Sequence, residues 1–301
     1  MTLNARNMEL LLRRLAAHPL KESQAFSRQL YERTFEIAPS LIRYTEPTPF
    51  DRDTRSALRR AGEALFARYP AREDQEENCG NGKGRQQGGV RLIEAAADAD
   101  DRILAALLHT SSTLSLEGCR NLVHRMSDAE KTALIKEAFR YLSEHDSVLR
   151  EFEYADLTFE LIISASCYAQ LKRHRMATLT VQDYDPALGV TVPSAIAETG
   201  MEPSFLEAIA GTEAVYQQIA RIAPQAAAYI LTNAHRRRAI LKVNARELYH
   251  MARLRADAHA QWDIRRITGD MLTLARQAMP LTFLLATGKD GFAEAYRALF
   301  P

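Results

Sequence analysis

Cysteine is scarce in this 301-residue sequence, and the few that occur argue against two kinds of stabilising site. Cys79, Cys119 and Cys167 are odd in number, lie far apart and form no Cys-x-x-Cys pair. A disulfide framework needs paired cysteines, and a zinc site of the common kind needs closely spaced ligands. We therefore expect neither a disulfide framework nor a metal site, and we expect Cys167 to be a small buried apolar side chain.

The sequence also lacks long apolar runs and an excess of charge of either sign. No run of 18 apolar residues occurs, and Asn4, Arg6 and Glu9 interrupt the stretch where a signal peptide would need an apolar segment. Lys and Arg total 39 against 38 Asp and Glu, a formal net charge of +1. This balance argues against nucleic-acid and membrane binding. We expect a cytoplasmic protein in which any anion site is local.

Apolar material, by contrast, is sufficient for a sizeable core, because 47% of the residues are hydrophobic and 26% are charged. The pattern divides the chain into a helical segment at residues 1–70, a flexible linker at 71–89 and an α/β domain at 90–301. The linker is predicted because REDQEENCGNGKGRQQGG has five glycines, many charges and almost nothing to bury. The chain is long enough for either one α/β domain with attached helices or two domains.

Apolar residues at helical spacing predict most of the elements. Prolines indicate an extended connector at 45–53 and a loop at 184–199. Ser127 with Glu130 forms a capping-box pattern. The longest C-terminal periodicity runs over 243–279, with a break near Asp257. The other expected helices cover 3–17, 21–37, 54–69, 98–108, 128–143, 203–222 and 224–234.

A cationic cluster follows the most strand-like stretch of the chain. LTFELIISASCY, from Leu157 to Tyr168, is apolar, β-branched and aromatic, which suits a buried strand or a short buried helix. Four cationic or potentially cationic side chains then occur at 172–175. Because such a cluster is costly to desolvate, it either faces water or meets an anion such as a phosphate or a flavin pyrophosphate.

A second cationic surface is predicted near the C-terminus. Asn244 opens a helical region in which Arg246 and Arg253 are seven residues apart. This spacing places the two arginines on one side of a helix. Each arginine could meet an anionic ligand or form an ordinary ion pair with a neighbouring carboxylate.

Three ordered motifs together resemble the flavin-dependent thymidylate synthases. RHRMAT at 173–178, NAREL at 244–248 and LRADAHAQWDIR at 254–265 are similar to that family, whose signature is Arg-His-Arg followed at fixed offsets by Ser, Asn, Ser and Arg. Phe-Glu-Tyr at 152–154 stands where the family usually has Phe-Glu-His. The resemblance covers roughly residues 90–300.

The resemblance implies a fold, an activity and cofactors. The expected fold is α/β, with a mixed sheet flanked by helices and an extra N-terminal helical segment, assembling as a homotetramer with sites between subunits. The implied reaction uses FAD, takes electrons from NADPH and transfers the methylene of methylenetetrahydrofolate to C5 of dUMP. The implied partner is therefore a pyrimidine nucleotide.

The resemblance also assigns candidate site residues. Arginine suits a diphosphate because of its fork of donors, and a cation near a pyrimidine carbonyl stabilises the negative charge that develops there. On this basis Arg255 and His259 are the expected catalytic residues. The nucleotide is expected to contact Gln170, Thr178 and Arg255, and the flavin to be held by Ser111, Glu153, Arg173, His174, Arg175, Asn244 and Arg246.

The pattern departs from the family immediately after the cationic cluster. Asp183 and Asp185 stand where the family presents a hydroxyl and a cation, and Ala228 stands where it has a phosphate-binding arginine. Losing two charge-assisted contacts, at about 1.5–3 kcal/mol each, weakens binding by roughly two to four orders of magnitude. Thr178 and Thr180 keep polar side chains. Compensating cations are available at Arg150, Lys172, Arg236, Arg237 and Arg238.

Two functions therefore stay open. The first is FAD-dependent methylation of dUMP, or of another acceptor by a divergent relative. The alternative is a non-catalytic paralogue that serves as a structural or regulatory flavin-binding subunit.

The N-terminus repeats the C-terminal motif in a weakened form. Asn4-Ala5-Arg6 matches Asn244-Ala245-Arg246, and Ala17-His18 matches Ala258-His259. Pro39 follows His18 by the 21 residues that separate Pro280 from His259. We hypothesise that residues 1–40 are the tail of a duplicated synthase domain; the alternative is chance similarity of two Arg- and Ala-rich helices.

Overall fold

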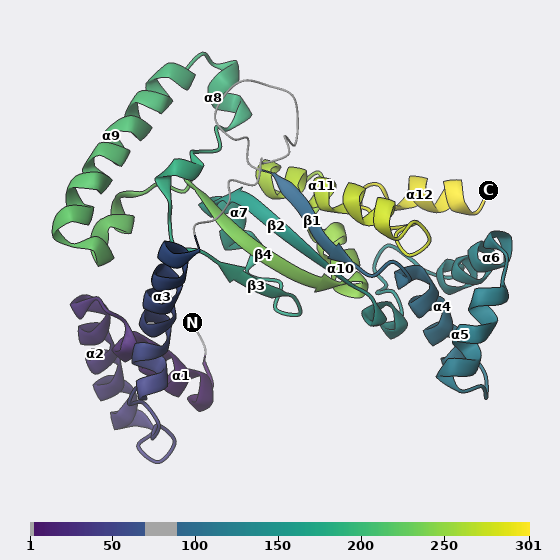
Figure 1. The fold of residues 1–301 in the computed structure, drawn as a ribbon, viewed down its shortest axis with the longest axis horizontal. Coiled ribbons are helices and arrows are strands. Elements are labelled where there is room, and N and C mark those ends of the chain that lie inside the picture. The colour runs from purple at the N-terminus through teal and green to yellow at the C-terminus, as the bar shows by residue number, and fades with distance from the viewer. Residues whose placement is uncertain (1–2, 70–88) are drawn as a thin grey trace. The chain divides into compact units, whose positions relative to one another are not determined.

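A computed structural model describes residues 3–69 and 89–301, and their internal contacts divide them into two units (Figure 1). The first unit comprises the described residues up to 69 together with 214–230, and the second comprises 89–213 and 231–301. The predicted linker lies, apart from Gly89, outside the described residues, as does Cys79. Within the described ranges, no helix has both the length and the apolar character needed to cross a membrane.

The first unit is helical, as the N-terminal segment was predicted to be. Its helices are α1 (Ala5–Ala17), α2 (Lys21–Ile37) and α3 (Pro49–Arg68), and the unit also includes the 3-10 helix η3 (Pro224–Ile230) from later in the chain. The prediction of an extended connector at 45–53 is wrong for its second half, because α3 already begins at Pro49. Thr48 and Asp51 form a capping box there, and a proline in the first turn loses no helical hydrogen bond.

The second unit is built on a four-stranded sheet in the order β1–β2–β4–β3, in which every strand pair is antiparallel. The strands are β1 (Val90–Ala95), β2 (Asp156–Ser164), β3 (Thr178–Val181) and β4 (Arg236–Asn244). In the β2–β4 register, Asp156 lies opposite Asn244 and Ser164 opposite Arg236. The α/β fold class is confirmed, and the sheet pairs two segments that are about 80 residues apart in the sequence.

One face of the sheet forms the core. Leu157, Phe159, Leu161 and Ile163 alternate along β2 and are all 0% exposed, as period-two geometry requires. The helices α7 (Ala165–Leu171), α10 (Ala245–Arg255) and α11 (Trp262–Ala278) pack on the strands, with α11 running beside β1 and β2 in Figure 1. On the other face, Glu160 pairs with Arg91 and Arg238 of the flanking strands.

Further helices complete the unit and refine the sequence-based predictions. The capping box of Ser127 and Glu130 is confirmed. The predicted helix at 224–234 is the shorter 3-10 helix η3, and the predicted loop at 184–199 contains two short helices. The remaining elements are α4 (Ala99–Thr110), α5 (Leu116–Arg125), α6 (Asp128–Phe139), η1 (Arg150–Tyr154), η2 (Pro186–Leu188), α8 (Ser194–Glu198), α12 (Phe292–Leu299) and α9 (Glu202–Ile222), whose residues from 214 onward belong to the first unit.

The helix pairs α1–α2 and α10–α11 share local details beyond their sequence similarity. The N-cap side chains Asn4 and Asn244 each accept a backbone N–H from three residues further on, at 2.9 and 2.8 Å. The second helix of each pair has 17 residues. The residue after it has φ −142°, ψ 60° at Ala38 and φ −139°, ψ 70° at Met279, and a proline follows in both cases.

A matching contact also closes both pairs. Glu9, five residues after the capping asparagine, accepts the backbone N–H of Tyr44 at 2.9 Å. Tyr249, at the same offset, accepts the backbone N–H of Leu285 at 3.3 Å. Tyr44 and Leu285 each lie five residues beyond the proline. The duplication stays a prediction, which superposition of residues 4–44 on 244–285 in an experimental structure would test.

Candidate functional site

The turn from β4 into α10 fixes the first group of candidate residues. Asn244 has an extended backbone (φ −78°, ψ 162°), and its side chain accepts the N–H of Glu247 at 2.8 Å. An N-cap of this kind satisfies a backbone donor that the first helical turn leaves free. Arg246 and Glu247 are thereby held in the first turn of the helix, and Arg255 follows in its last turn.

The Arg-His-Arg sequence lies on a turn after a helix. The stretch expected to be a strand or a helix contains both, because Ser164 ends β2 and caps α7 by accepting the N–H of Cys167 at 3.0 Å. The chain then turns, and the N–H of His174 donates to the carbonyl of Leu171 at 3.0 Å. His174 is 6% exposed, whereas Arg173 and Arg175 point to solvent.

Four side chains from the two segments meet in one hydrogen-bonded set. Arg255 donates from Nε to Nε2 of His174 at 3.1 Å and from Nη1 to Oε1 of Gln170 at 3.1 Å. Nδ1 of His174 lies 3.2 Å from Oε1 of Glu247. Burial, followed by the charge of Arg173, lowers the pKa of the Arg255 guanidinium. The structure thus brings together the predicted residues Gln170, His174 and Arg255.

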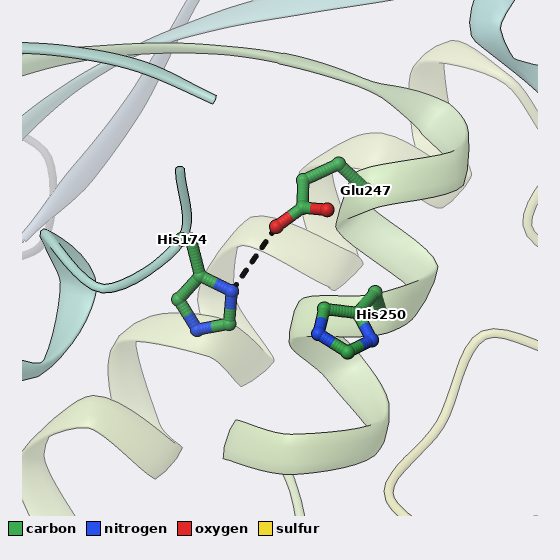
Figure 2. A group of neighbouring side chains, drawn as sticks. All are labelled: His174, Glu247 and His250. Atoms are coloured by element: carbon green, nitrogen blue, oxygen red, sulfur yellow. Dashed lines mark hydrogen bonds and ion pairs between the residues drawn. The ribbon is translucent and has the colours of Figure 1, made fainter. Parts of the chain in front are cut away.

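Two members of this cluster were not predicted from the sequence. Glu247 is 8% exposed, and His250 packs edge-on to His174 with ring centroids 5.9 Å apart (Figure 2). Burial lowers the pKa of His250, which favours its neutral form. The available signal was the spacing of three between Glu247 and His250, which places both on one helix face.

The ligand atoms of His174, Glu247 and His250 lie within 4.8 Å of one another, the one cluster of this kind in the described part of the chain. The hydrogen bonds nevertheless disfavour a metal ion. Arg255 donates to Nε2 of His174, and Arg253 lies 3.3 Å from Nδ1 of His250. Because arginine only donates, each neutral imidazole accepts from it at one nitrogen and carries its hydrogen on the other. Neither nitrogen of either ring then has a lone pair left for a metal ion. The cluster fits histidine N–H groups around a carboxylate.

A cavity of about 220 Å³ lies beside this cluster. Arg246 spans its wall, donating from Nε to the carbonyl of Val148 at 3.0 Å and from Nη1 to Glu153 at 3.1 Å. The hydrogen bond from Arg150, followed by the charges of Arg150 and Arg246, lowers the pKa of Glu153. Predicted and unpredicted residues share the lining, which includes Glu153, Asn244, Arg246, Glu247, His250 and Arg253.

The cavity suits a polar, hydrogen-bonding ligand, because its lining carries charges of both signs, from Arg246, Arg253 and Lys289 and from Glu144, Asp146, Glu153 and Glu247. Nε of Arg253 is buried and has no hydrogen-bond partner among the described residues, although its Nη1 donates to the carbonyls of His145 and Asp146. Buried donors of this kind are normally satisfied, and Arg253 is one of the residues that line the cavity. The exposed Arg173 and Arg175 add cations nearby in the sequence. The residues present are compatible with part of a flavin, and the binding of a flavin by these residues stays a prediction.

Five predicted residues are not brought into the cluster or the cavity lining: the exposed Arg173 and Arg175, and Ser111, Thr178 and His259. Ser111 is the exposed C-cap of α4, and Thr178 is the exposed first residue of β3. His259 lies exposed in the turn between α10 and α11, where its N–H donates to Asp257. Their assignment to flavin, nucleotide and catalysis stays a prediction.

The residues that depart from the family pattern have local structural partners. Asp185 caps η2 by accepting the N–H of Ala187 at 2.9 Å. Arg237 lies over the rings of Tyr168 and Tyr184, at 4.9 and 4.3 Å from their centroids. The other cations considered as compensation also contact the protein: Arg150 pairs with Glu153, Lys172 lies over Tyr168, Arg236 donates to Thr191 and Arg238 pairs with Glu160.

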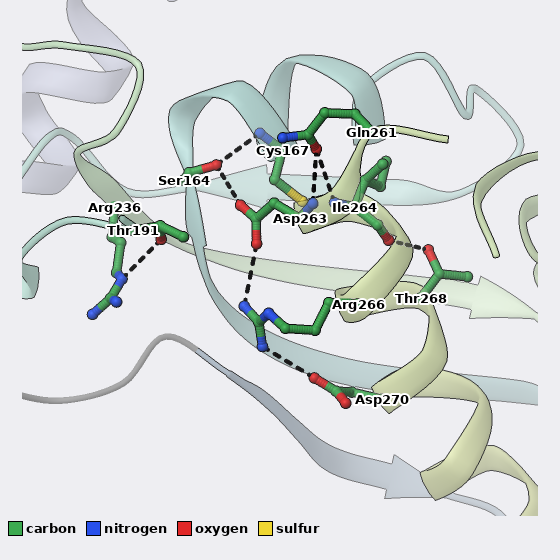
Figure 3. A network of polar contacts seen from close by, with 10 residues as sticks. All are labelled: Ser164, Cys167, Thr191, Arg236, Gln261, Asp263, Ile264, Arg266, Thr268 and Asp270. Atoms are coloured by element: carbon green, nitrogen blue, oxygen red, sulfur yellow. Dashed lines mark hydrogen bonds and ion pairs between the residues drawn. The ribbon is translucent and has the colours of Figure 1, made fainter. Parts of the chain in front are cut away.

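A buried polar network holds α7 against α11 (Figure 3). Asp263 is 0% exposed, accepts from Oγ of Ser164 at 2.5 Å and pairs with Arg266 at 3.2 Å. Arg266 also reaches Asp270 at 3.2 Å on the outer side of the helix. Because Ser164 caps α7, this network positions the helix that carries Gln170 and leads into the Arg-His-Arg turn.

Comparison with known proteins gives a consistent result. A family model described as "Thymidylate synthase complementing protein" matches residues 91–281. A flavin-dependent thymidylate synthase of Haloarcula marismortui is 30% identical over 231 residues, covering 64% of this chain and 93% of that one. A UPF0159 protein of Chlamydia muridarum is 28% identical over 279 residues, covering 89% of this chain and 50% of that one.

The match with the chlamydial protein leaves half of the longer chain uncovered. A second chlamydial protein, from Chlamydia pneumoniae, is matched over 49% of its length, so the present chain spans about half of these two relatives. Among solved structures, a UMP/dUMP methylase, PolB from Streptomyces cacaoi bound with 5-Br dUMP, matches with a TM-score of 0.53. It is 19% identical and covers 71% of this chain and 96% of that one, so this likeness concerns the fold.

Proposed function

Because this chain belongs to the thymidylate synthase complementing protein family, we propose that it methylates a pyrimidine nucleotide with the help of a bound flavin. The proposed reaction converts dUMP to dTMP with methylenetetrahydrofolate and NADPH, in a homotetramer with sites between subunits. The solved structure with a similar fold is that of a UMP/dUMP methylase, which is compatible with this substrate class.

One observation carries the proposal. The hydrogen bonds of Arg255 to His174 and to the nearby Gln170 join two of the three motifs on which the family resemblance rests. These motifs lie about 80 residues apart in the chain, and burial alone does not require polar side chains of this kind to meet. Polar groups that converge beside a cavity favour a binding site over a solvated surface.

Arg255 is the residue we assign to the acceptor ring. Two of its donors are used by His174 and Gln170, which leaves the rest of the guanidinium fork for a ligand. A fixed cation at a pyrimidine carbonyl stabilises the negative charge that grows on the ring when C5 attacks a one-carbon unit. Gln170 would hold the guanidinium from the other side.

The cavity beside α10 is the site we assign to part of the flavin. Arg246, Asn244 and Glu153, which line the cavity, would bind and orient the cofactor. Arg173 and Arg175 would meet its diphosphate, for which the arginine fork is suited. A bound flavin would supply the reducing equivalents, drawn from NADPH, that turn the transferred methylene into a methyl group.

Spectroscopy of the purified protein tests the cofactor, and tritium release tests the reaction. We expect a visible flavin spectrum, and release of tritium from 5-tritiated dUMP that depends on both methylenetetrahydrofolate and NADPH. Bound flavin without tritium release would support the alternative, a structural or regulatory flavin-binding subunit. Flavin reoxidation by the folate without any dependence on dUMP would point to a different acceptor.

Asp185 is expected to weaken the binding of the nucleotide phosphate. Replacing it with arginine restores the cation of the family pattern, and one charge-assisted contact corresponds to roughly a 10- to 100-fold lower Kd for dUMP. The matched control is Asp185→Asn, because an asparagine side chain still accepts the N–H of Ala187 and caps η2. We expect this control to give only a small gain, and equal gains in both variants would argue against a phosphate contact. Titration of the flavin spectrum with dUMP measures both.

A further inference from the structure

Glu247, which was not among the predicted site residues, occupies an unusual position for a carboxylate. It lies in the first turn of α10, where Asn244 fixes its backbone N–H, and its side chain is buried with the residue 8% exposed. A buried carboxylate is costly unless it is hydrogen-bonded. Its carboxylate Oε1 lies 3.2 Å from Nδ1 of His174, so the imidazole is its side-chain partner.

Arg255 determines how this imidazole can be protonated. Its Nε donates to Nε2 of His174 at 3.1 Å, and a guanidinium has no acceptor. The Nε2 atom must therefore present its lone pair, and the neutral ring carries its hydrogen on Nδ1, facing Glu247. A doubly protonated ring would set its Nε2–H against the Nε–H of Arg255. The two neighbours thus select one tautomer from opposite sides of the ring.

The two partners of the His174 ring, Glu247 and Arg255, have a fixed spacing because both belong to α10. Glu247 and Arg255 are eight residues apart on α10, and His174, on the Arg-His-Arg turn, contacts Glu247 through Nδ1 and Arg255 through Nε2. The same guanidinium donates from Nη1 to Gln170 at 3.1 Å. Arg253 and Arg246 also lie near His250, and Glu247 is the buried carboxylate of the cluster.

We propose that Glu247 is a positioning residue for Arg255, acting through the Nδ1–H tautomer of His174. With Glu247 in place, the Nε2 lone pair of His174 and the amide oxygen of Gln170 hold the guanidinium in the orientation that meets the acceptor. Without Glu247, the other histidine tautomer becomes accessible, and its Nε2–H pushes Arg255 away. The consequence for catalysis rests on the proposed function, whereas the consequence for the tautomer does not.

Nitrogen-15 NMR of the full-length protein with labelled histidine tests the tautomer directly. In the wild type and in Glu247→Gln, whose amide oxygen can still accept, we expect the His174 resonances of an Nδ1–H ring. In Glu247→Leu we expect a mixture of the two neutral tautomers. His174→Asn identifies the His174 signals. An Nε2–H ring in the wild type, or an unchanged spectrum in Glu247→Leu, would overturn the proposal whatever the enzyme catalyses.

A double-mutant cycle on nucleotide binding tests the link to Arg255. Glu247→Leu is expected to weaken dUMP binding about tenfold, as loss of one well-oriented contact would. The same substitution added to Arg255→Ala should have little further effect, because the group it positions is already gone. Glu247→Gln should stay within about threefold of the wild type.

Equal losses in the presence and absence of Arg255 would show that Glu247 acts elsewhere, and would reject the positioning role. A Glu247→Gln variant as damaged as Glu247→Leu would show that charge, and not hydrogen-bond acceptance, matters. Glu137→Leu, at an exposed residue of α6, serves as the control for the same carboxylate-to-apolar replacement outside the site. If the wild type binds neither flavin nor dUMP, the proposed function fails, and the NMR result still decides the role of Glu247.

Discussion

Replacing Arg255 with lysine is expected to lower the kcat/KM for dUMP methylation by roughly 10²- to 10³-fold, the range for removal of one donor to a developing negative charge. Lysine keeps the charge but has a single ammonium group and no fork of donors. It cannot contact His174 and Gln170 in the present geometry and still face a ligand. Steady-state kinetics with tritiated dUMP measure the change.

The matched control for this variant is Arg297→Lys, on α12. Arg297 is exposed and donates from Nε to the carbonyl of Ala293, one turn earlier on the same helix. The kcat/KM of Arg297→Lys should stay within about twofold of the wild type, because substitutions at exposed positions outside a site have small effects. Flavin content should be unchanged in both variants. Wild-type activity in Arg255→Lys would show that the guanidinium of Arg255 is not needed for the reaction.

Much of the site scaffold could be predicted from the sequence because it depends on local signals. Asn244 precedes a helical pattern as an N-cap residue should, and the break near Asp257 marks the turn between α10 and α11. The apolar run after Leu157 correctly indicated a buried element. Its division into β2 and α7 was not predicted, because Ser164 acts as a cap through contacts that a short apolar run does not reveal.

The partners within the site depend on tertiary structure, which explains why two of them were missed. Glu247 belongs to a predicted motif, but nothing local to NAREL indicates that its carboxylate would meet a histidine 73 residues earlier. His250 was overlooked for the same reason. Conversely, Ser111, Thr178 and His259 carry the predicted residue types, yet their positions in this chain leave them exposed and outside the cluster.

The compensating cations show a further limit of sequence patterns. A run of three arginines at 236–238 suggested a charged surface that could replace the missing phosphate contacts. The run lies on β4, where successive side chains alternate between faces of the sheet. Arg236 therefore meets Thr191 near the loop, Arg237 meets two tyrosines and Arg238 meets Glu160. The three arginines, although consecutive in the sequence, therefore do not form one cationic patch but lie in three different environments.

Replacing Asp263 with alanine is expected to lower the free energy of unfolding of the second unit by about 3 kcal/mol, the scale for breaking a buried, hydrogen-bonded charge interaction. The substitution leaves Oγ of Ser164 without its acceptor inside the protein. It also removes the inner partner of Arg266. Urea unfolding followed by the fluorescence of Trp262, the single tryptophan and the first residue of α11, reports on this region.

Asp270→Ala separates burial from charge in this network, because Asp270 pairs with the same Arg266 at the same 3.2 Å but lies on the outer side of the helix. An exposed pair contributes about 0–1 kcal/mol, so this variant should unfold close to the wild type. Comparable losses in the two variants would mean that Arg266, and not the link from Asp263 to Ser164, stabilises the unit. A large loss confined to Asp263→Ala, accompanied by weaker flavin binding, would show that the contact between α7 and α11 sets the position of the Arg-His-Arg turn.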